Sequence, residues 1–124
     1  MSPDLSLPPE RRLSRSKVIQ SILDDGTIFK GKYCHTFVGQ PDDKPTRAAF
    51  VVSRKSARKA TDRNRIKRLM RESFRLLQPN FEEGWPLVFV ATRSVHGDLN
   101  RQDFDEDIRE HLSDAGILKG EQEP

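Results

Sequence analysis

Short apolar runs alternate with polar stretches along this chain, and their spacing predicts where the strands lie. Residues 28–39 are rich in aromatic and β-branched types, which favour extended structure. Two further apolar runs, within 47–53 and 85–93, are typical of buried strands. The prolines and aspartates of 40–46 and the Gly-Asp pair at 97–98 indicate turns. We therefore expect three strands.

Apolar residues spaced three and four positions apart predict the helices. Three helices are expected, at 14–25, from Thr61 to just before Pro79, and at 100–114. Ser14 or Ser16 is a candidate cap for the first helix, and Gly26 is placed to end it. Thr61 is the expected cap of the second.

In chain order the predicted elements read α-β-β-α-β-α. Helices packed on a sheet of three or four strands give an α+β fold, here a two-layer α/β sandwich. We expect one domain over residues 14–115. A flexible, proline-rich arm is expected at 1–13 and a frayed acidic tail at 116–124.

Length and composition narrow the class of protein. A chain of 124 residues, 34% of them hydrophobic, has room for one small core. No stretch approaches the roughly 18 apolar residues of a membrane span, and the first residues lack the apolar run of a secretory signal. The one cysteine, Cys34, allows neither an internal disulfide nor a multi-thiolate metal site. These features predict a soluble cytoplasmic protein.

Charge is unevenly distributed. The segment 44–75 holds twelve Lys and Arg but only two acids, a net charge of +10. Because the whole chain carries +3, the remainder carries −7. Such a concentrated positive segment favours a polyanionic partner, RNA or DNA by default.

The second helix sorts these charges onto one side. Its expected buried side consists of Ile66, Leu69, Met70, Ser73, Leu76 and Leu77. Asn64, Arg68, Arg71 and Arg75 fall together on the opposite side. Guanidinium groups held in register on a rigid helix suit phosphates, to which they donate paired hydrogen bonds.

Catalytic side chains do not cluster in the sequence. His35, His96 and His111 fall in three different elements and lack the spacing of a zinc site. Phe37 alternates with His35 and Tyr33 and is the best candidate for stacking on a base, although core packing is the commoner role. The acids of the last helix favour a solvated face over a loose Mg²⁺ site: Asp103, Asp105, Glu106, Asp107 and Glu110.

Three segments, Arg54-Lys55, Ala60–Arg68 and Arg71–Arg75, closely resemble the signature of the protein component of bacterial ribonuclease P. That signature is an Arg-Asn-Arg helix preceded by a basic strand end, and the resemblance extends over residues 11–115. It implies a ribosomal-protein-like fold with a left-handed βαβ crossover, where the general rule favours a right-handed one.

The resemblance also implies a function. In this family an RNA subunit cleaves precursor tRNA, using Mg²⁺, and gives the mature 5′ end. The protein binds that catalytic RNA and the 5′ leader of the precursor, with no organic cofactor, no membrane and no obligate protein partner. The protein alone is then expected to be inactive, with no catalytic residue of its own and no assigned metal site.

Transferred to this chain, the family pattern gives two sets of RNA-binding residues. The set facing the catalytic RNA is Arg63, Asn64, Arg65, Lys67, Arg68, Arg71 and Arg75. The set near the leader, in a cleft between the first helix and the sheet, is Ile19, Leu23, His35, Phe37, Arg54, Lys55 and Arg93.

Two departures from the family pattern matter. Ile19 and Leu23 stand where the family usually has phenylalanines, so they cannot supply base stacking, which is worth about 1–3 kcal/mol per base. The charge of −7 outside the basic segment suggests RNA contact on one face only. Two other classes stay open: a structural RNA-binding protein such as a ribosomal protein, and a free-standing ribonuclease.

Overall fold

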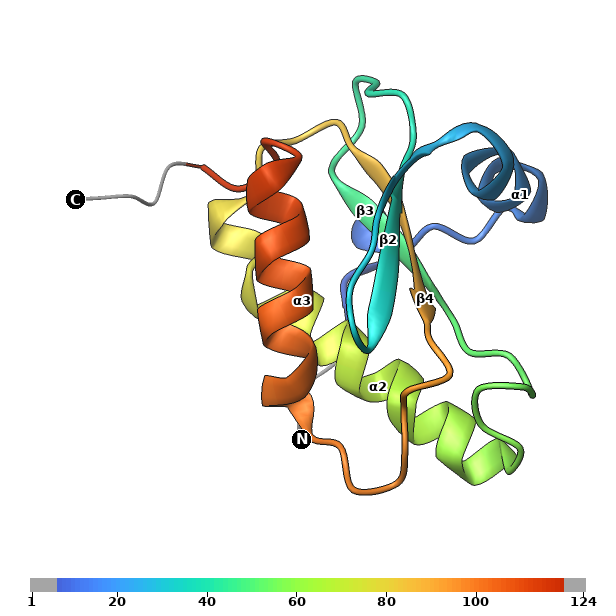
Figure 1. Cartoon of the computed structure of the whole chain (residues 1–124). Coiled ribbons are helices and arrows are strands. Elements are labelled where there is room, and N and C mark those ends of the chain that lie inside the picture. Colours follow the sequence, from blue (N-terminus) through green and yellow to red (C-terminus); the bar gives the residue numbers. More distant parts are fainter. Residues whose placement is uncertain (1–6, 120–124) are drawn as a thin grey trace.

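The computed structural model describes residues 7–119 and confirms the α+β class (Figure 1). The helices are α1 (Ser16–Asp25), α2 (Ala60–Leu76) and α3 (Arg101–Asp114). The strands are β1 (Thr27–Phe29), β2 (Cys34–Val38), β3 (Arg47–Val51) and β4 (Pro86–Ala91). Two short 3₁₀ helices, η1 (Pro9–Arg11) and η2 (Gln78–Asn80), complete the set. No helix within 7–119 has the length and apolar character needed to cross a bilayer.

The four strands form one mixed sheet in the order β1-β2-β4-β3. β2 pairs antiparallel with both β1 and β4, whereas β3 and β4 are parallel neighbours. A parallel pair needs a crossover connection, and α2 supplies it. The expected βαβ unit is therefore β3-α2-β4, and the handedness of its crossover stays a prediction.

The single strand expected at 28–39 is wrong, because this segment is the hairpin of β1 and β2. Chain reversal occurs around Gly31, where an added Cβ would lie 2.7 Å from the Asp107 carboxyl carbon. The Asp107 carboxylate accepts hydrogen bonds from the backbone N–H groups of Tyr33 (2.7 Å) and Cys34 (3.1 Å). A side chain of α3 thus fixes the turn, a long-range contact that the local pattern does not reveal.

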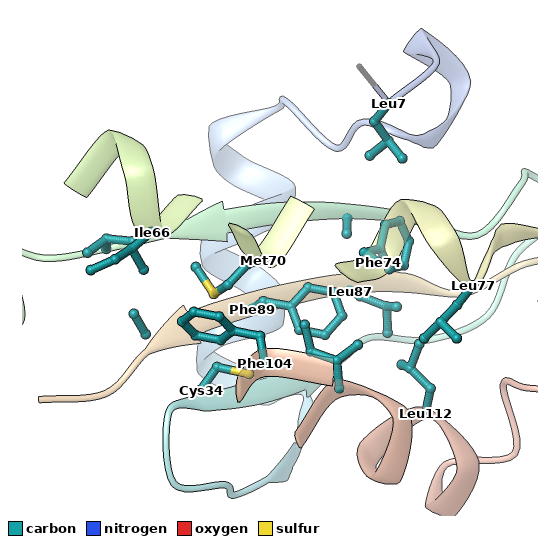
Figure 2. Packing of buried hydrophobic residues seen from close by; sticks show 14 of the residues in the cluster. Leu7, Cys34, Ile66, Met70, Phe74, Leu77, Leu87, Phe89, Phe104 and Leu112 are labelled. Carbon is teal, nitrogen blue, oxygen red and sulfur yellow. The ribbon is translucent and has the colours of Figure 1, made fainter. Parts of the chain in front are cut away.

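The main core lies between the sheet and the pair α2 and α3 (Figure 2). Leu87 and Phe89 of β4 point to this side, as expected for alternating strand positions. Phe74 of α2 and Phe104 of α3 meet them and are fully buried. The sheet and these two helices are the two layers expected.

Helix α1 covers part of the opposite sheet face as a further, partial layer (Figure 1). Ile22 is its one buried residue, and it packs with Leu13, Ala49 and Val88. Gly39 permits this approach, because a Cβ there would lie 2.9 Å from the Ile22 side chain. α1 therefore rests on the sheet along a narrow line.

The three residues predicted as candidate helix N-caps, Ser14, Ser16 and Thr61, are not N-caps in the structure. α1 is preceded by Arg15, so neither Ser14 nor Ser16 caps it, and α2 begins at Ala60 with Lys59 as its N-cap. Neither N-cap residue makes a side-chain capping bond. α3 does have a capping box, in which Asn100 and Asp103 each accept from the other's backbone N–H.

The ends of the described chain are packed, not free. Leu7 is fully buried, and the backbone N–H of Leu13 donates to the Ala48 carbonyl at 2.9 Å. At the other end Ile117 is buried, and Leu118 forms an isolated antiparallel β-bridge with Phe81. Parts of the expected arm (7–13) and tail (117–119) thus contact the rest of the protein, while 1–6 and 120–124 lie outside the described residues and the domain bounds stay a prediction.

Candidate nucleic-acid interface

Helix α2 separates its two faces largely as predicted. Ile66, Met70 and Phe74 are buried against the sheet and α3. Asn64 and Arg68 are exposed on the other side. Leu76, expected on the buried face, is 44% exposed, although Phe74 and Leu77 beside it in the chain are buried in the main core.

The basic residues of α2 differ in what they contact. Arg63 Nη1 donates to the carbonyl oxygens of Ala57 (3.1 Å) and Arg58 (2.7 Å). Arg65 donates through both terminal nitrogens, to Gly97 O at 3.0 Å and to Leu99 O at 2.6 Å. Both guanidinium groups thus bind loops of the protein itself.

Further along α2, two more arginines have protein contacts. The Arg71 guanidinium lies 5.9 Å from the centre of the Phe50 ring, a cation–π contact. Arg75 pairs with Glu72, whose pKa is lowered chiefly by the hydrogen bond from Arg75. Within residues 7–119, by contrast, Asn64, Lys67 and Arg68 have no hydrogen-bond or ion-pair partner, so they present the least committed polar groups of this face.

A basic loop joins β3 to α2 and extends the positive surface. Its four cationic residues, Arg54, Lys55, Arg58 and Lys59, are all exposed. The loop forms one wall of a depression of about 350 Å³, and residues 95–97 form the opposite wall. The N-terminal half of α2 and this loop therefore make one continuous cationic surface.

The predicted cleft residues do gather on the α1 side of the sheet. Ile19 and Leu23 of α1 and Phe37 of β2 are half-buried in one apolar cluster. Val51 and Val90, which are register partners, belong to the same cluster and are also half-buried. Apolar side chains beside α1 thus remain accessible between that helix and the sheet.

His35 and three cations lie at one end of this apolar surface. His35 is the register partner of Val90. Arg54 and Lys55 follow the end of β3, and Arg93 follows the end of β4. Because β3 and β4 are parallel neighbours, their following residues emerge at the same sheet edge. The apolar residues of this face are therefore bordered by positive charge.

Tyr33 is not on this face, which corrects the expected alternation with His35 and Phe37. It precedes β2 and packs on the opposite side of the sheet, with its ring 6.2 Å from that of Phe104. The misassignment follows from treating 28–39 as one strand. Phe37 is then the remaining aromatic candidate for base stacking on the α1 side.

The histidines and the cysteine do not form a catalytic group. His35 Nδ1 accepts from the Gly31 N–H at 3.3 Å, and burial, then Lys30 and His111, lower the pKa of its ring. His111 is buried and bonded to the Thr36 hydroxyl at 2.7 Å. Burial raises the pKa of the Cys34 thiol, which disfavours the reactive thiolate.

Metal-binding groups are likewise missing from the described part of the chain, which holds no set of three or more His, Cys, Asp or Glu side chains arranged for an ion. The acids of α3 have structural partners instead: Asp103 in the capping box, Asp105 with Ser73 and Arg101, and Asp107 on the hairpin turn. These three carboxylates are therefore engaged within the protein.

Comparisons with known proteins agree with these features. A family model described as Ribonuclease P matches residues 7–116. The ribonuclease P protein component of Picosynechococcus is 29% identical over 116 residues, which cover 94% of this chain and 99% of that protein. That of Pseudomonas fluorescens is 36% identical over 105 residues, covering 84% and 76% of the two chains.

A solved structure shares the fold. The RNase P protein from Thermotoga maritima superposes with a TM-score of 0.74 at 23% identity, covering 88% of this chain and 98% of that one. A similarity at this level of identity supports the α+β architecture alone.

Proposed function

Because this chain belongs to the family of ribonuclease P protein components, we propose that it binds a catalytic RNA and the 5′ leader of precursor tRNA as the protein subunit of ribonuclease P. The family indicated by the Arg-Asn-Arg helix is thereby confirmed. The enzyme is a ribonucleoprotein endonuclease that removes the leader and leaves the mature tRNA 5′ end. In this assignment the RNA performs the cleavage, and the protein increases the affinity of the enzyme for precursor tRNA.

One observation carries the proposal: a rigid cationic surface exists without a catalytic group beside it. Asn64 and Arg68 are exposed on α2 and Lys67 is half-buried beside them, and Arg58 and Lys59 of the preceding loop are exposed as well. The helix holds the backbone of these residues in register, so phosphate binding has to order their side chains but not their backbone. This surface is therefore proposed to dock the catalytic RNA.

The leader is proposed to lie on the α1 side of the sheet. Phe37 offers a half-buried ring there, and Arg54, Lys55 and Arg93 supply charge for the leader phosphates. Ile19 and Leu23 offer apolar contact but no stacking. Leader binding then depends more on Phe37 and on charge than it does where two aromatic residues occupy the α1 positions.

Mg²⁺ is proposed as the metal of the holoenzyme, held by the RNA. The carboxylates of the described residues do not fit a protein-held Mg²⁺ site, since no three of them converge and Asp103, Asp105 and Asp107 of α3 already accept structural hydrogen bonds. Phosphate oxygens of RNA are the alternative hard ligands that Mg²⁺ prefers. A cytoplasmic location is also proposed, because precursor tRNA is processed in that compartment of a bacterium.

The deciding experiment is a cleavage assay on precursor tRNA. The assay compares the cognate RNA alone, the protein alone, and both together at low Mg²⁺. We expect cleavage by the pair to exceed that of the RNA alone, and no cleavage by the protein alone. Absence of stimulation would contradict the proposed role.

Two control arms separate the other classes. Cleavage by the protein alone, abolished by His35→Ala or His111→Ala, would indicate a free-standing ribonuclease. Co-sedimentation with ribosomes without any effect on tRNA maturation would indicate a structural RNA-binding protein.

A further inference from the structure

The Arg-Asn-Arg sequence at 63–65 divides into two kinds of side chain. Asn64 is exposed, whereas Arg63 and Arg65 are partly buried. Arg65 donates to two main-chain carbonyl oxygens that lie 32 and 34 residues away in the chain, and Arg63 donates to two carbonyl oxygens of the loop directly before α2. The two positively charged members of the motif are thus directed at the protein.

The loop bound by Arg65 connects β4 to α3. Its internal backbone bonds are long, with Val95 N at 3.4 Å from Thr92 O and Leu99 N at 3.3 Å from His96 O. The bonds from Arg65 to Gly97 O and Leu99 O, at 3.0 and 2.6 Å, are shorter and come from another element. Arg65 therefore restrains a loop whose own hydrogen bonds are weak.

The loop bound by Arg63 is the basic connection between β3 and α2. A turn at Ser53, where the N–H groups of Ser56 and Ala57 donate to Ser53 O, shapes its first half. Arg63 fixes the second half through the carbonyls of Ala57 and Arg58. The direction of the Arg58 and Lys59 side chains depends on that backbone.

These two loops are the opposite walls of the depression of about 350 Å³ at the start of α2. Lys55, Arg58 and Lys59 line it on one side and residues 95–97 on the other. The hydrogen bonds of Arg63 and Arg65 therefore set the spacing of its walls.

We infer that Arg63 and Arg65 are positioning residues for RNA binding: they hold these two loops, while Arg68, Arg58 and Lys59 meet the phosphates. The inference rests on the proposed function. It also changes the prediction made for the Arg-Asn-Arg motif, in which all three residues faced the RNA.

Lysine substitution distinguishes positioning from charge. Lysine keeps the positive charge but lacks the planar fork that lets one side chain donate from two nitrogens to two fixed acceptors. A residue that acts through charge alone tolerates lysine. A residue that bridges two carbonyls does not.

The test compares Arg65→Lys and Arg65→Gln with the matched pair Arg68→Lys and Arg68→Gln. Two quantities are measured: the affinity of the folded protein for its cognate ribonuclease P RNA over a range of salt, and hydrogen exchange of amides 95–99 in the free protein. Arg63→Gln, with exchange followed at 57–59, examines the other loop; lysine is not used there, because Arg63 donates both bonds from Nη1 and a lysine ammonium could do the same. Thermal unfolding establishes a temperature at which every variant is folded.

We expect both Arg65 variants to lose about tenfold in affinity, the equivalent of one hydrogen bond to a charged group, and to exchange faster at 95–99. Arg68→Lys should retain most affinity. Arg68→Gln should lower the log–log salt slope by up to about 0.9 and leave exchange unchanged.

Full affinity of Arg65→Lys would overturn the inference. So would a loss of affinity with unchanged loop exchange, since it would mean that Arg65 binds a phosphate directly. The exchange results are obtained without RNA, so they do not depend on the outcome of the stimulation assay that tests the proposed function.

Discussion

Helices α2 and α3 pack side by side on one face of the sheet, and both carry many charges, yet the charges are used differently (Figure 1). The acids of α3 mostly accept hydrogen bonds from this protein: Asp103 from Asn100, Asp105 from Ser73, and Asp107 from the hairpin turn. On α2, Asn64, Lys67 and Arg68 have no such partner within residues 7–119. The difference shows that a charged helix face indicates a ligand site only where its charges lack internal partners.

The largest expected effect concerns the buried side of α2. Phe74→Ala should lower the free energy of unfolding by about 3–5 kcal/mol, because it removes a fully buried ring from between Phe81 and Phe89. Urea unfolding measures this loss. Leu76→Ala, at a position 44% exposed, is the matched control and should stay within about 0.5 kcal/mol of the parent. Equal losses would mean that the facing of α2 is misassigned.

The next effect tests whether an acid of α3 is structural. Asp107→Ala leaves the N–H groups of Tyr33 and Cys34 without their carboxylate acceptor, which should cost about 1–3 kcal/mol of stability. Glu106→Ala, an exposed neighbour on the same helix, should change stability by less than about 0.5 kcal/mol. If Asp107→Ala were instead neutral, α3 would carry a merely solvated acidic face, as the sequence suggested.

Arg68, an exposed cation of α2, should affect RNA binding and not stability. Arg68→Ala should leave the free energy of unfolding nearly unchanged but weaken RNA binding by about 1 kcal/mol, with a shallower salt dependence. Filter binding or fluorescence titration with the cognate RNA measures both quantities. Arg109→Ala, on the exposed side of α3, serves as the control and should retain full affinity. A matching loss there would mean that RNA contacts α3 as well.

The smallest effect concerns an ion pair away from both helices. The hydrogen bond from Arg11 lowers the pKa of Glu83 from its usual 4.5 to about 2. A depressed pKa in the folded state stabilises the protein above pH 4.5, and this stability is lost as pH falls toward 2. Glu83 is 53% exposed, so solvent screening should limit the contribution to less than about 1 kcal/mol.

Glu83→Gln is the variant that isolates this pair. Its unfolding free energy should fall below that of the parent at pH 7 and converge with it near pH 2. Chemical denaturation at several pH values detects the difference. A constant difference across that range would indicate a packing effect rather than ionisation.

The sequence predicted those features that depend on neighbours in the chain. Periodicity located the three helices: Ile66, Met70 and Ser73, predicted on the buried side of α2, are buried, although Phe74 was not predicted there. The apolar runs at 47–53 and 85–93 located β3 and β4 for the same reason. The charge partition identified the basic surface, because exposed cations need no tertiary contact to be recognised.

The features missed depend on residues distant in sequence. The hairpin at Gly31 is fixed by Asp107, and the Arg65 guanidinium is directed by carbonyls of residues 97 and 99. Leu7 looks like part of a flexible arm until β3 and its surroundings are placed around it. Residue type and spacing cannot identify such partners. The leader residues stay predictions, and so do the RNA-facing residues, among which the variants above test Arg63, Arg65 and Arg68.

The hydrogen bond between Leu13 and Ala48 covers part of an exposed sheet edge. β3 is at one edge of the sheet, and an open edge strand can pair with a strand of another molecule. The N-terminal segment lies along β3 and occupies part of that edge. At the other edge β1 is only three residues long, too short to template much pairing. Removing residues 7–13 should therefore expose the edge of β3 and favour strand-mediated self-association, which size-exclusion chromatography would detect.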